Sequence, residues 1–377
     1  KMATSERYER LKKLMARENL DVTVVISPEN TLYFAETYIM TQASIRDRLA
    51  IAVLPLEQEP AFIGCSIEQA TIESETWIAD KRFYTEFVES PVAVLANVLK
   101  EKGLDHGKVG IELDYLMAHY YKELISLLPD VEFVPCTYLF NRIRMIKEPV
   151  EIEMLSTAAK KTREALEKAL LETHPGDTEF QLASKIKRHM LDDGADYITF
   201  LVMGTGDHST QTHKLPNQDI LADGELMRID YGASYSFGKY HCYNSDVART
   251  VLIGKPNPVY VDVMKRLCEA YFYTYEHVRA GVTAKELYTL CKDKCTALGL
   301  NFACPHIGHS LGIGLHEFPM LSPKEDFALE ENMVFCIEPI IRQDGRMFHQ
   351  EDLVQVTKDG YKVLSVDDFN PRYLEIK

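Results

Sequence analysis

Apolar residues recur at helical spacing near the start of the chain and then give way to a β-branched run. The residues that share one face of the helix expected over residues 5–18 are Tyr8, Leu11, Leu14 and Met15. Residues 21–27 are rich in valine and end at the turn-forming sequence Pro-Glu-Asn, so a strand should follow the helix. Strands and helices continue to alternate up to about residue 142. This pattern predicts an α/β domain.

The sequence Ile-Lys-Glu-Pro at residues 146–149 interrupts this alternation, and a long amphipathic helix is expected directly after it. Its apolar stripe consists of Ile152, Leu155, Ala159, Leu166 and Ala169. The length of 377 residues exceeds what one hydrophobic core usually supports. We therefore expect an N-terminal domain over residues 1–145 and a second domain over residues 146–377.

The second domain repeats a pattern of its own. Residues 176–182 are echoed by residues 281–287, which begin 105 positions later (281 minus 176). Each segment carries a capping box at the start of an expected helix, and each helix ends near a glycine. Each copy then continues with a histidine, a proline and an acidic strand residue: His213 leads to Asp230, and His316 leads to Glu338. Two related halves would place their acidic strands around a common site.

Charge and composition exclude several classes of function. Acidic residues outnumber basic ones by 57 to 42, and the net charge of −15 disfavours a nucleic-acid partner. The charged amphipathic start has no apolar stretch of the kind that a signal peptide or membrane span requires, so we expect a cytoplasmic protein without a membrane partner. The eight cysteines show no paired Cys-x-x-Cys spacing, which fits a reducing compartment.

Candidate chemistry lies in carboxylates within otherwise apolar, strand-like runs. Burying such a group is costly unless a cation accompanies it. For a single acid, an ion pair with Lys or Arg is the simpler explanation. Several such acids and a glycine-flanked histidine, taken together, favour a metal site; they are Asp230, Asp246, His309, Glu338 and Glu351.

With these residues in order, the chain resembles the pita-bread metallohydrolase superfamily of methionine aminopeptidase, aminopeptidase P, prolidase and creatinase. The resemblance also covers Asn30 and Tyr33 after the first strand and the linker at residues 144–149. It implies a creatinase-like N-terminal domain, a pseudo-twofold catalytic domain and two divalent metal ions. Four carboxylates and one imidazole suit Mn²⁺ best, with Co²⁺, Zn²⁺ and Fe²⁺ as alternatives. The resemblance further implies a homodimer.

The resemblance also implies roles for individual residues. Asp230 would bind one metal ion, His309 and Glu338 would belong mainly to the other or bridge the two, and Asp246 and Glu351 would bridge them. Glu338 would serve as general base and acid. His316 would stabilise the developing oxyanion, and His213 would line the substrate pocket from the opposite side. Arg342 and His349 are further candidates for substrate binding.

Departures from the family pattern cluster beside the predicted metal ligands. The spacing between Asp230 and Asp246 is longer than usual, which enlarges the hairpin at residues 234–241. Ile340 and Arg342 replace the usual Gly and Tyr, and His349 replaces an Arg.

The leading hypothesis is an Xaa-Pro dipeptidase or aminopeptidase that uses a metal-activated hydroxide. The alternative is a non-peptide hydrolase or lyase acting on a small zwitterion, as creatinase or ectoine hydrolase does. A metal-free interaction module is disfavoured because all five ligand positions are occupied by suitable residues.

Overall fold

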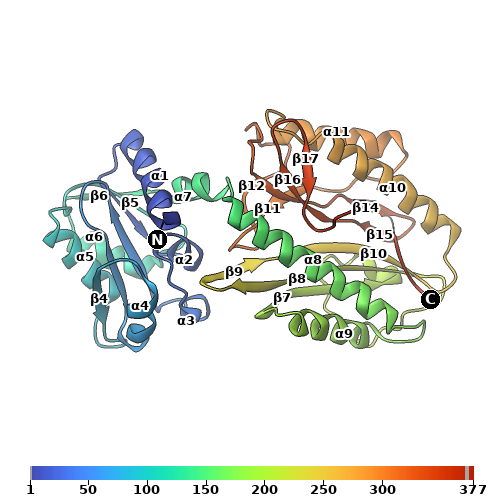
Figure 1. Cartoon of the computed structure of the whole chain (residues 1–377), viewed down its shortest axis with the longest axis horizontal. Helices are drawn as coiled ribbons and strands as arrows, with labels where there is room; N and C mark the ends of the chain where they lie inside the picture. Colours follow the sequence, from blue (N-terminus) through green and yellow to red (C-terminus); the bar gives the residue numbers. More distant parts are fainter. Residues whose placement is uncertain (1, 370–372) are drawn as a thin grey trace. The chain divides into compact units, whose positions relative to one another are not determined.

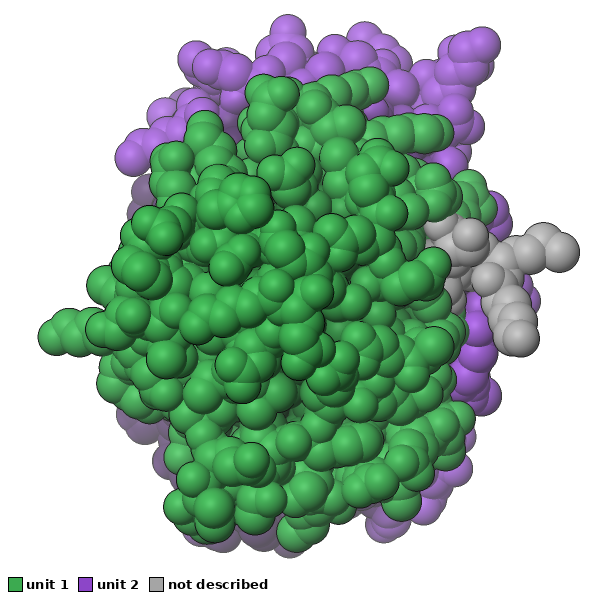
Figure 2. Space-filling view, turned by 90° about the vertical axis from the view of Figure 1, so that its left-hand side faces the viewer, with its two compact units in different colours: residues 1–144 green, residues 145–377 purple. Residues whose placement is uncertain are grey.

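A computed structural model describes residues 2–369 and 373–377. The chain forms two compact units, residues 1–144 and residues 145–377, which are coloured separately in Figure 2. Each unit is described by itself below. No helix in the described parts of the chain is both long and apolar enough to cross a membrane.

Unit 1 is built on one mixed sheet (Figure 1), and its strands are paired in the order β4-β3-β2-β1-β5-β6. The strands are β1 (Val22–Val25), β2 (Ile51–Pro55), β3 (Ala61–Cys65), β4 (Asp80–Tyr84), β5 (Gly107–Ile111) and β6 (Val131–Pro135). The helices are α1 (Met2–Glu18), α2 (Pro28–Ala35), α3 (Met40–Ser44), α4 (Gln69–Glu75), α5 (Pro91–Glu101), α6 (Ala118–Leu127) and α7 (Thr137–Arg144), with a 3-10 turn η1 (Ser66–Glu68). The central strand β1 is buried at every position, as its β-branched sequence predicts.

Unit 2 contains two larger sheets and a two-stranded one. The first has the order β18-β10-β8-β7, with β9 paired to β8; the second has the order β12-β11-β13-β16-β17; the small sheet is β14-β15. The strands of the first sheet are β7 (Tyr197–Thr205), β8 (Leu226–Phe237), β9 (Tyr240–Asn244), β10 (Val247–Ile253) and β18 (Leu374–Ile376). The other strands are β11 (Gly308–Ser310), β12 (Glu317–Met320), β13 (Val334–Ile337), β14 (Ile340–Gln343), β15 (Arg346–His349), β16 (Asp352–Val356) and β17 (Tyr361–Val363).

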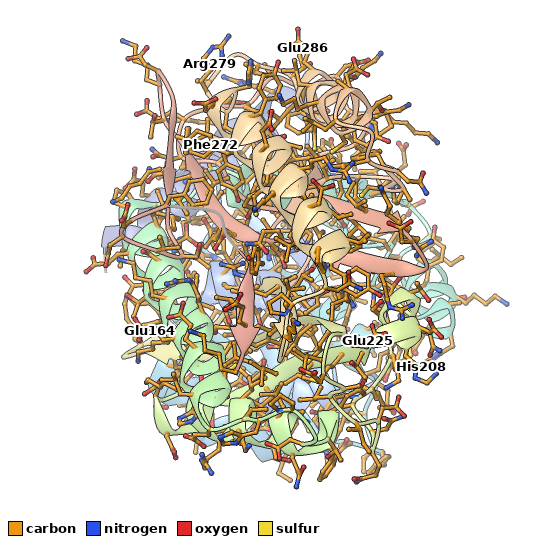
Figure 3. All side chains as sticks on the ribbon, turned by 90° about the vertical axis from the view of Figure 1, so that its right-hand side faces the viewer. Glu164, His208, Glu225, Phe272, Arg279 and Glu286 are labelled. Carbon is orange, nitrogen blue, oxygen red and sulfur yellow. The ribbon has the colours of Figure 1, made fainter. Side chains whose placement is uncertain are left out.

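Four long helices accompany these sheets, together with a 3-10 turn η2 (Gly206–Thr210). They are α8 (Pro149–Leu171), α9 (Glu179–Asp192), α10 (Pro258–Glu276) and α11 (Ala284–Ala297). The outer faces of α8 and α10 carry Glu164 and Phe272 (Figure 3), while their inner faces pack on the sheets. The expected long helix after Pro149 is therefore confirmed, and it begins with that proline at its first position.

The predicted repeat has the same local structure in both copies. Thr178 caps α9 and Thr283 caps α11, each in a reciprocal capping box. Both capping threonines also form an isolated bridge to a later segment, Thr178 to Ile220 and Thr283 to Ala328. The helices end before Gly194 and Gly299, both with positive φ. Each half of unit 2 thus contributes an equivalent helix and sheet.

Candidate metal centre

The first sheet presents two of the predicted ligands on one face. Asp230 on β8 lies opposite Ala248 on β10, and Asp246 precedes Ala248 by two residues. Side chains two apart on a strand point the same way, so Asp230 and Asp246 are diagonal neighbours on one face. The two carboxyl groups are close enough for each to shift the pKa of the other.

The second sheet presents the other three in the same manner. His309 on β11 lies opposite Cys336 on β13, and Cys336 lies opposite Leu353 on β16. Glu338 follows Cys336 by two residues, and Glu351 precedes Leu353 by two. Strand alternation therefore directs His309, Glu338 and Glu351 to one face of the second sheet.

Two glycines allow the backbones that carry these residues to approach closely. A Cβ on Gly232 would lie 2.1 Å from the carbonyl oxygen of Ser245, and a Cβ on Gly308 would lie 1.9 Å from the carbonyl oxygen of Cys336. Any side chain at these positions would displace the neighbouring backbone segment. The two glycines therefore bring the segments bearing Asp246 and His309 into place.

The side chains from both sheets converge. The Nε2 atom of His309 lies 3.5 Å from Asp246 Oδ2 and 3.6 Å from Glu338 Oε1. Ligand-capable atoms of Asp246, His309 and Glu351 lie within 4.8 Å of one another, and the same holds for Glu338 and Glu351. The five residues predicted as ligands, which are up to 121 positions apart in the sequence (351 minus 230), thus meet in one cluster.

This cluster is electrostatically unfavourable without a cation. Burial raises the pKa of Asp246 well above its ordinary range, and the carboxylates of Glu351, Asp230 and Glu338 raise it further. Burial, followed by the charge of Glu338, likewise raises the pKa of Glu351. Burial and the nearby Asp230 raise the pKa of Glu338 to about 8. Asp246 Oδ1 and both carboxylate oxygens of Glu351 are buried without a regular hydrogen-bond partner among the described residues. These oxygens are suited to divalent cations, so the residues fit a metal site.

His309 is prepared to bind through one nitrogen. Its Nδ1 lies 3.0 Å from the carbonyl oxygen of Ser310, and since a carbonyl only accepts, Nδ1 carries the proton. The unprotonated Nε2 then faces the acids. Burial is the main cause that lowers the pKa of His309 to about 3, and His316 adds to it. The imidazole is therefore neutral, as a metal ligand must be.

The remaining predicted residues surround this cluster at different depths. His316 is an exposed residue whose ring stacks on His309 at a centroid distance of 3.7 Å. Desolvation on the stacked side lowers its pKa. His213 is exposed in the loop before β8, and the charges of His213 and His316 act on Asp230. Arg342 is exposed on β14 and donates to Thr212 Oγ1 over 3.3 Å. His349, in contrast, is fully buried, 3.3 Å from Glu338 Oε2.

Three neighbours of the cluster were not singled out as site residues from the sequence. Arg228 contacts Asp230, the Cys336 side chain lies among the acids, and His306 Nδ1 lies 3.7 Å from Glu338 Oε1. Arg228 and Cys336 each precede a predicted ligand by two residues on the same strand. The two-residue period of a strand was the signal that could have identified both.

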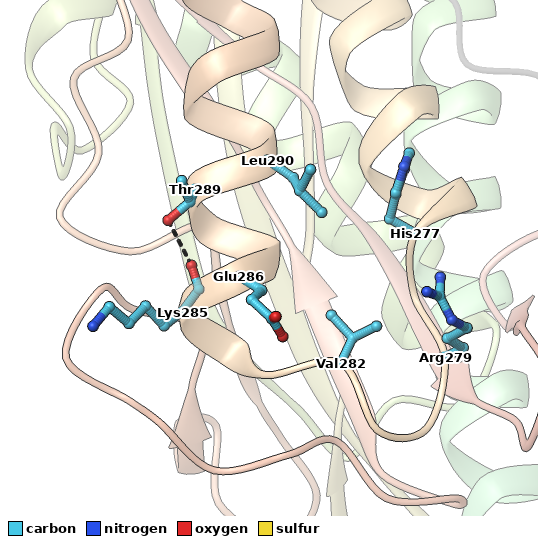
Figure 4. Close-up of a pocket in the computed structure, with 7 residues that line it drawn as sticks. All are labelled: His277, Arg279, Val282, Lys285, Glu286, Thr289 and Leu290. Atoms are coloured by element: carbon cyan, nitrogen blue, oxygen red, sulfur yellow. Dashed lines mark hydrogen bonds between the residues drawn. The ribbon is translucent and has the colours of Figure 1, made fainter.

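A surface pocket elsewhere in unit 2 is separate from this cluster (Figure 4). Its lining residues are His277, Arg279, Val282, Lys285, Glu286, Thr289 and Leu290. The carboxylate of Glu286 is already bound by the backbone and hydroxyl of Thr283 at the start of α11. Thr289 likewise donates to the Lys285 carbonyl. The pocket therefore has no part in the chemistry of the acidic cluster.

Two sheets that surround buried carboxylates and one neutral imidazole define a metal-dependent hydrolase. The profile of "Metallopeptidase family M24" matches residues 153–358, and that of "Creatinase/Prolidase N-terminal domain" matches residues 7–146. The chain belongs to metallopeptidase family M24. The resemblance inferred from the sequence, the mixed α/β fold and the assignment as a hydrolase are thereby confirmed.

Individual relatives agree with this assignment. The chain is 29% identical to an Xaa-Pro dipeptidase of Pyrococcus furiosus over 373 residues, which is 96% of this chain and 97% of the relative. It is 29% identical to an uncharacterized peptidase of Bacillus subtilis over 262 residues, 68% of this chain and 72% of that one. An Xaa-Pro dipeptidase from Bacillus anthracis has the same fold, with a TM-score of 0.88 at 24% identity over 99% of both chains.

Proposed function

We propose that the protein is an Xaa-Pro dipeptidase that hydrolyses the C–N bond of a short peptide with the help of two divalent cations. The observation that carries this proposal is the convergence of four acids and the Nε2 atom of His309 from two sheets. The relatives support the choice of substrate, because they include Xaa-Pro dipeptidases. They do not favour the alternative of a creatinase-like or ectoine hydrolase-like activity.

In this proposal, Asp230, Asp246, His309, Glu338 and Glu351 hold the cations. Cations bound there would polarise the scissile carbonyl and lower the pKa of an attacking water. Glu338 would take the proton from that water as a carboxylate and return it to the leaving nitrogen. His316 donates a hydrogen bond to the developing oxyanion.

Arg342 provides a means of selecting dipeptides. Its exposed guanidinium is held beside Thr212, which directly precedes the proposed substrate-lining residue His213. A guanidinium binds a carboxylate through two parallel hydrogen bonds. We propose that Arg342 binds the C-terminal carboxylate of the substrate while His213 contacts its other side.

We propose Mn²⁺ as the preferred metal, because carboxylates dominate the cluster. Cys336 is the one soft donor beside them in the part of the chain that the structure describes. Competition between Mn²⁺ and Zn²⁺ in the wild type and in Cys336→Ser tests this choice. If Mn²⁺ is preferred through the carboxylates, both proteins bind it with similar affinity. A large loss of metal affinity in Cys336→Ser would instead assign a ligand role to the thiol.

The family resemblance also leads us to propose a cytoplasmic homodimer. The eight cysteines are all free, which fits a reducing compartment. Light scattering during gel filtration tests the dimer, and fractionation of the native host tests the compartment.

The proposed activity is tested by measuring metal content and turnover together. The substrate panel comprises Xaa-Pro dipeptides, longer Xaa-Pro peptides, creatine and ectoine. We expect metal-dependent turnover of the dipeptides, and loss of both bound metal and turnover in Asp246→Ala. Cleavage restricted to creatine or ectoine would overturn the peptidase assignment, and full activity of Asp246→Ala would overturn the two-metal mechanism.

A further inference from the structure

A buried arginine links the first sheet of unit 2 to the small β14-β15 sheet beside the candidate metal centre. Arg228 on β8 is only 1% exposed. Its Nη2 donates to Asp230 Oδ2 over 2.7 Å, and its Nη1 donates to the carbonyl oxygen of Thr212. Its Nε and Nη2 lie 3.2 Å and 3.1 Å from Nδ1 of His349. The guanidinium therefore holds a carboxylate with one edge and an imidazole with another.

This contact determines the tautomer of His349. A guanidinium has donors and no acceptor, so Nδ1 of His349 must accept and cannot carry a proton. In the neutral ring the proton then lies on Nε2, which is 3.3 Å from Glu338 Oε2 but makes no regular hydrogen bond within the described residues. The donor nitrogen of His349 consequently faces Glu338, while its acceptor nitrogen faces Arg228.

The backbone of His349 is held as firmly as its ring. Its N–H donates to Thr250 Oγ1 over 2.8 Å, and its carbonyl accepts from the same hydroxyl over 3.1 Å. Thr250 lies on β10, which also pairs directly with β8. With the ring fully buried and both ends of the residue anchored, His349 has little freedom to turn toward a substrate.

We infer that Arg228 and His349 are a positioning pair that fixes Asp230 and Glu338, two proposed ligands on different sheets, relative to each other. This inference rests on the proposed function, and it assigns His349 a positioning role in place of substrate binding. The guanidinium of Arg228 reaches both Asp230 and His349 from β8, which packs against β15. Carboxylate ligands and their hydrogen-bond donors act as one unit, so loss of the donor weakens binding of the metal.

The experiment measures Mn²⁺ binding to the metal-depleted full chain by calorimetry, alongside turnover and urea unfolding. Arg228→Met is expected to weaken Mn²⁺ binding by roughly 10–100-fold. Turnover should lose kcat with little change in KM, because neither residue reaches the substrate. Arg228→Lys keeps the charge but not the forked geometry, and it should show a smaller loss in the same direction. It also remains informative if Arg228→Met does not fold.

Substitutions at His349 separate its two contacts. The side-chain oxygen of His349→Asn can accept from Arg228 but offers no donor at the Nε2 position. His349→Gln offers a donor toward Glu338 but not the acceptor for Arg228. Both should weaken Mn²⁺ binding, and each should show a loss that is not additive with that of Arg228→Met.

A rescue variant and a control complete the design. Arg228→Met/His349→Arg returns a guanidinium to position 349, and it should bind Mn²⁺ more tightly than Arg228→Met alone. Arg346→Met removes a guanidinium that pairs with Glu225 and Asp207 away from the cluster, and it should leave Mn²⁺ binding unchanged. Wild-type Mn²⁺ affinity in Arg228→Met, or strictly additive losses, would overturn the positioning role. Failure of the wild type to bind metal would instead overturn the proposed function.

Discussion

The ammonium group of Lys147 lies 2.7 Å from Glu317 Oε2, and both side chains are almost fully buried. Lys147 belongs to the segment that precedes α8, whereas Glu317 directly follows the proposed oxyanion donor His316. The other carboxylate oxygen of Glu317 accepts from the N–H of Gly314 over 2.9 Å. The ion pair therefore anchors the loop that carries His316.

We predict that Lys147→Met leaves the buried Glu317 carboxylate without its cation and lowers the free energy of unfolding by about 3–5 kcal/mol. Urea unfolding of both proteins measures the difference. The matched control is Lys160→Met, which removes an ion pair to Asp367 whose side chains are 34% and 90% exposed. The control should lose less than about 1 kcal/mol. Equal losses in the two variants would show that burial does not set the strength of the Lys147 pair.

The side chain of Glu112 in unit 1 tests whether a buried acceptor can be replaced by a group that also donates. Its buried carboxylate accepts from the N–H groups of Ile26 and Ser27, from the Ser27 hydroxyl and from the Asn30 amide. Glu112→Gln would turn an NH₂ group toward these donors, and we predict a loss of about 2–3 kcal/mol in the free energy of unfolding. Urea unfolding measures it. An unchanged midpoint would mean that the four donors do not require a carboxylate.

The ion pair between Asp80 and Arg82 should make the stability of the protein depend on pH. The hydrogen bond from Arg82 is the largest influence on the pKa of Asp80, and despite partial burial the pKa lies below the ordinary value of 3.8. Because the pKa of Asp80 is lower in the folded state than in the unfolded state, the ionised carboxylate stabilises the protein fully at pH values above the unfolded-state pKa. This stabilisation is lost as the pH falls through the folded-state pKa. Asp80→Asn should therefore be less stable at pH 6 by up to about 1 kcal/mol. The difference should shrink below pH of about 4. A difference that grows on acidification would contradict the assignment.

Removal of the metal should lower the melting temperature of the wild type, whereas Asp246→Asn should raise the melting temperature of the metal-free protein. Chelation should lower the melting temperature of the wild type, since bound cations stabilise by about 2.7 kcal/mol at a hundredfold excess over Kd. In the metal-free protein, Asp246→Asn removes one charge from a cluster of buried acids, so its melting temperature should exceed that of the metal-free wild type. Added Mn²⁺ should then stabilise only the wild type. Thermal unfolding with chelator and with Mn²⁺ compares the four states.

Arg342 is expected to bind the C-terminal carboxylate of the substrate. Arg342→Gln should raise KM for an Xaa-Pro dipeptide by roughly 10-fold or more, the loss expected for a charged hydrogen bond. The same dipeptide with an amidated C-terminus should be a poor substrate of the wild type and should not distinguish the two proteins. Steady-state kinetics on both substrates give the comparison. A rise in KM that is equal for both substrates would place Arg342 away from the carboxylate.

The sequence predicted elements with a strong local pattern most accurately. The helix expected over residues 5–18 is α1, and the β-branched run after it is β1. The two capping boxes begin α9 and α11 as expected, because the hydrogen bonds of a helix cap join residues only three positions apart.

The grouping of the five candidate ligands was expected from the family resemblance, and Asp230 and Glu338 also stand out as acids within apolar strand-like runs. The contacts of Arg228 could not be predicted from the sequence, because its partner His349 lies 121 positions away (349 minus 228). The two residues meet only through the packing of β15 against β8. The sequence likewise does not reveal that His349 is fully buried while Arg342, seven positions earlier, is exposed. Burial of a residue at a strand end depends on the neighbouring strands, which local sequence does not specify.

The division of the ligands between two sheets has a consequence for how the protein matures. Asp230 and Asp246 come from the first sheet, and His309, Glu338 and Glu351 come from the second. Under the proposed function, neither sheet alone would offer enough donors to hold a pair of ions tightly, so a nascent chain would gain affinity for metal only after the strands of the second sheet have been synthesised and docked. Capture of the ions would then report completed folding of the second unit, and partly made chains would be protected from premature hydrolytic chemistry.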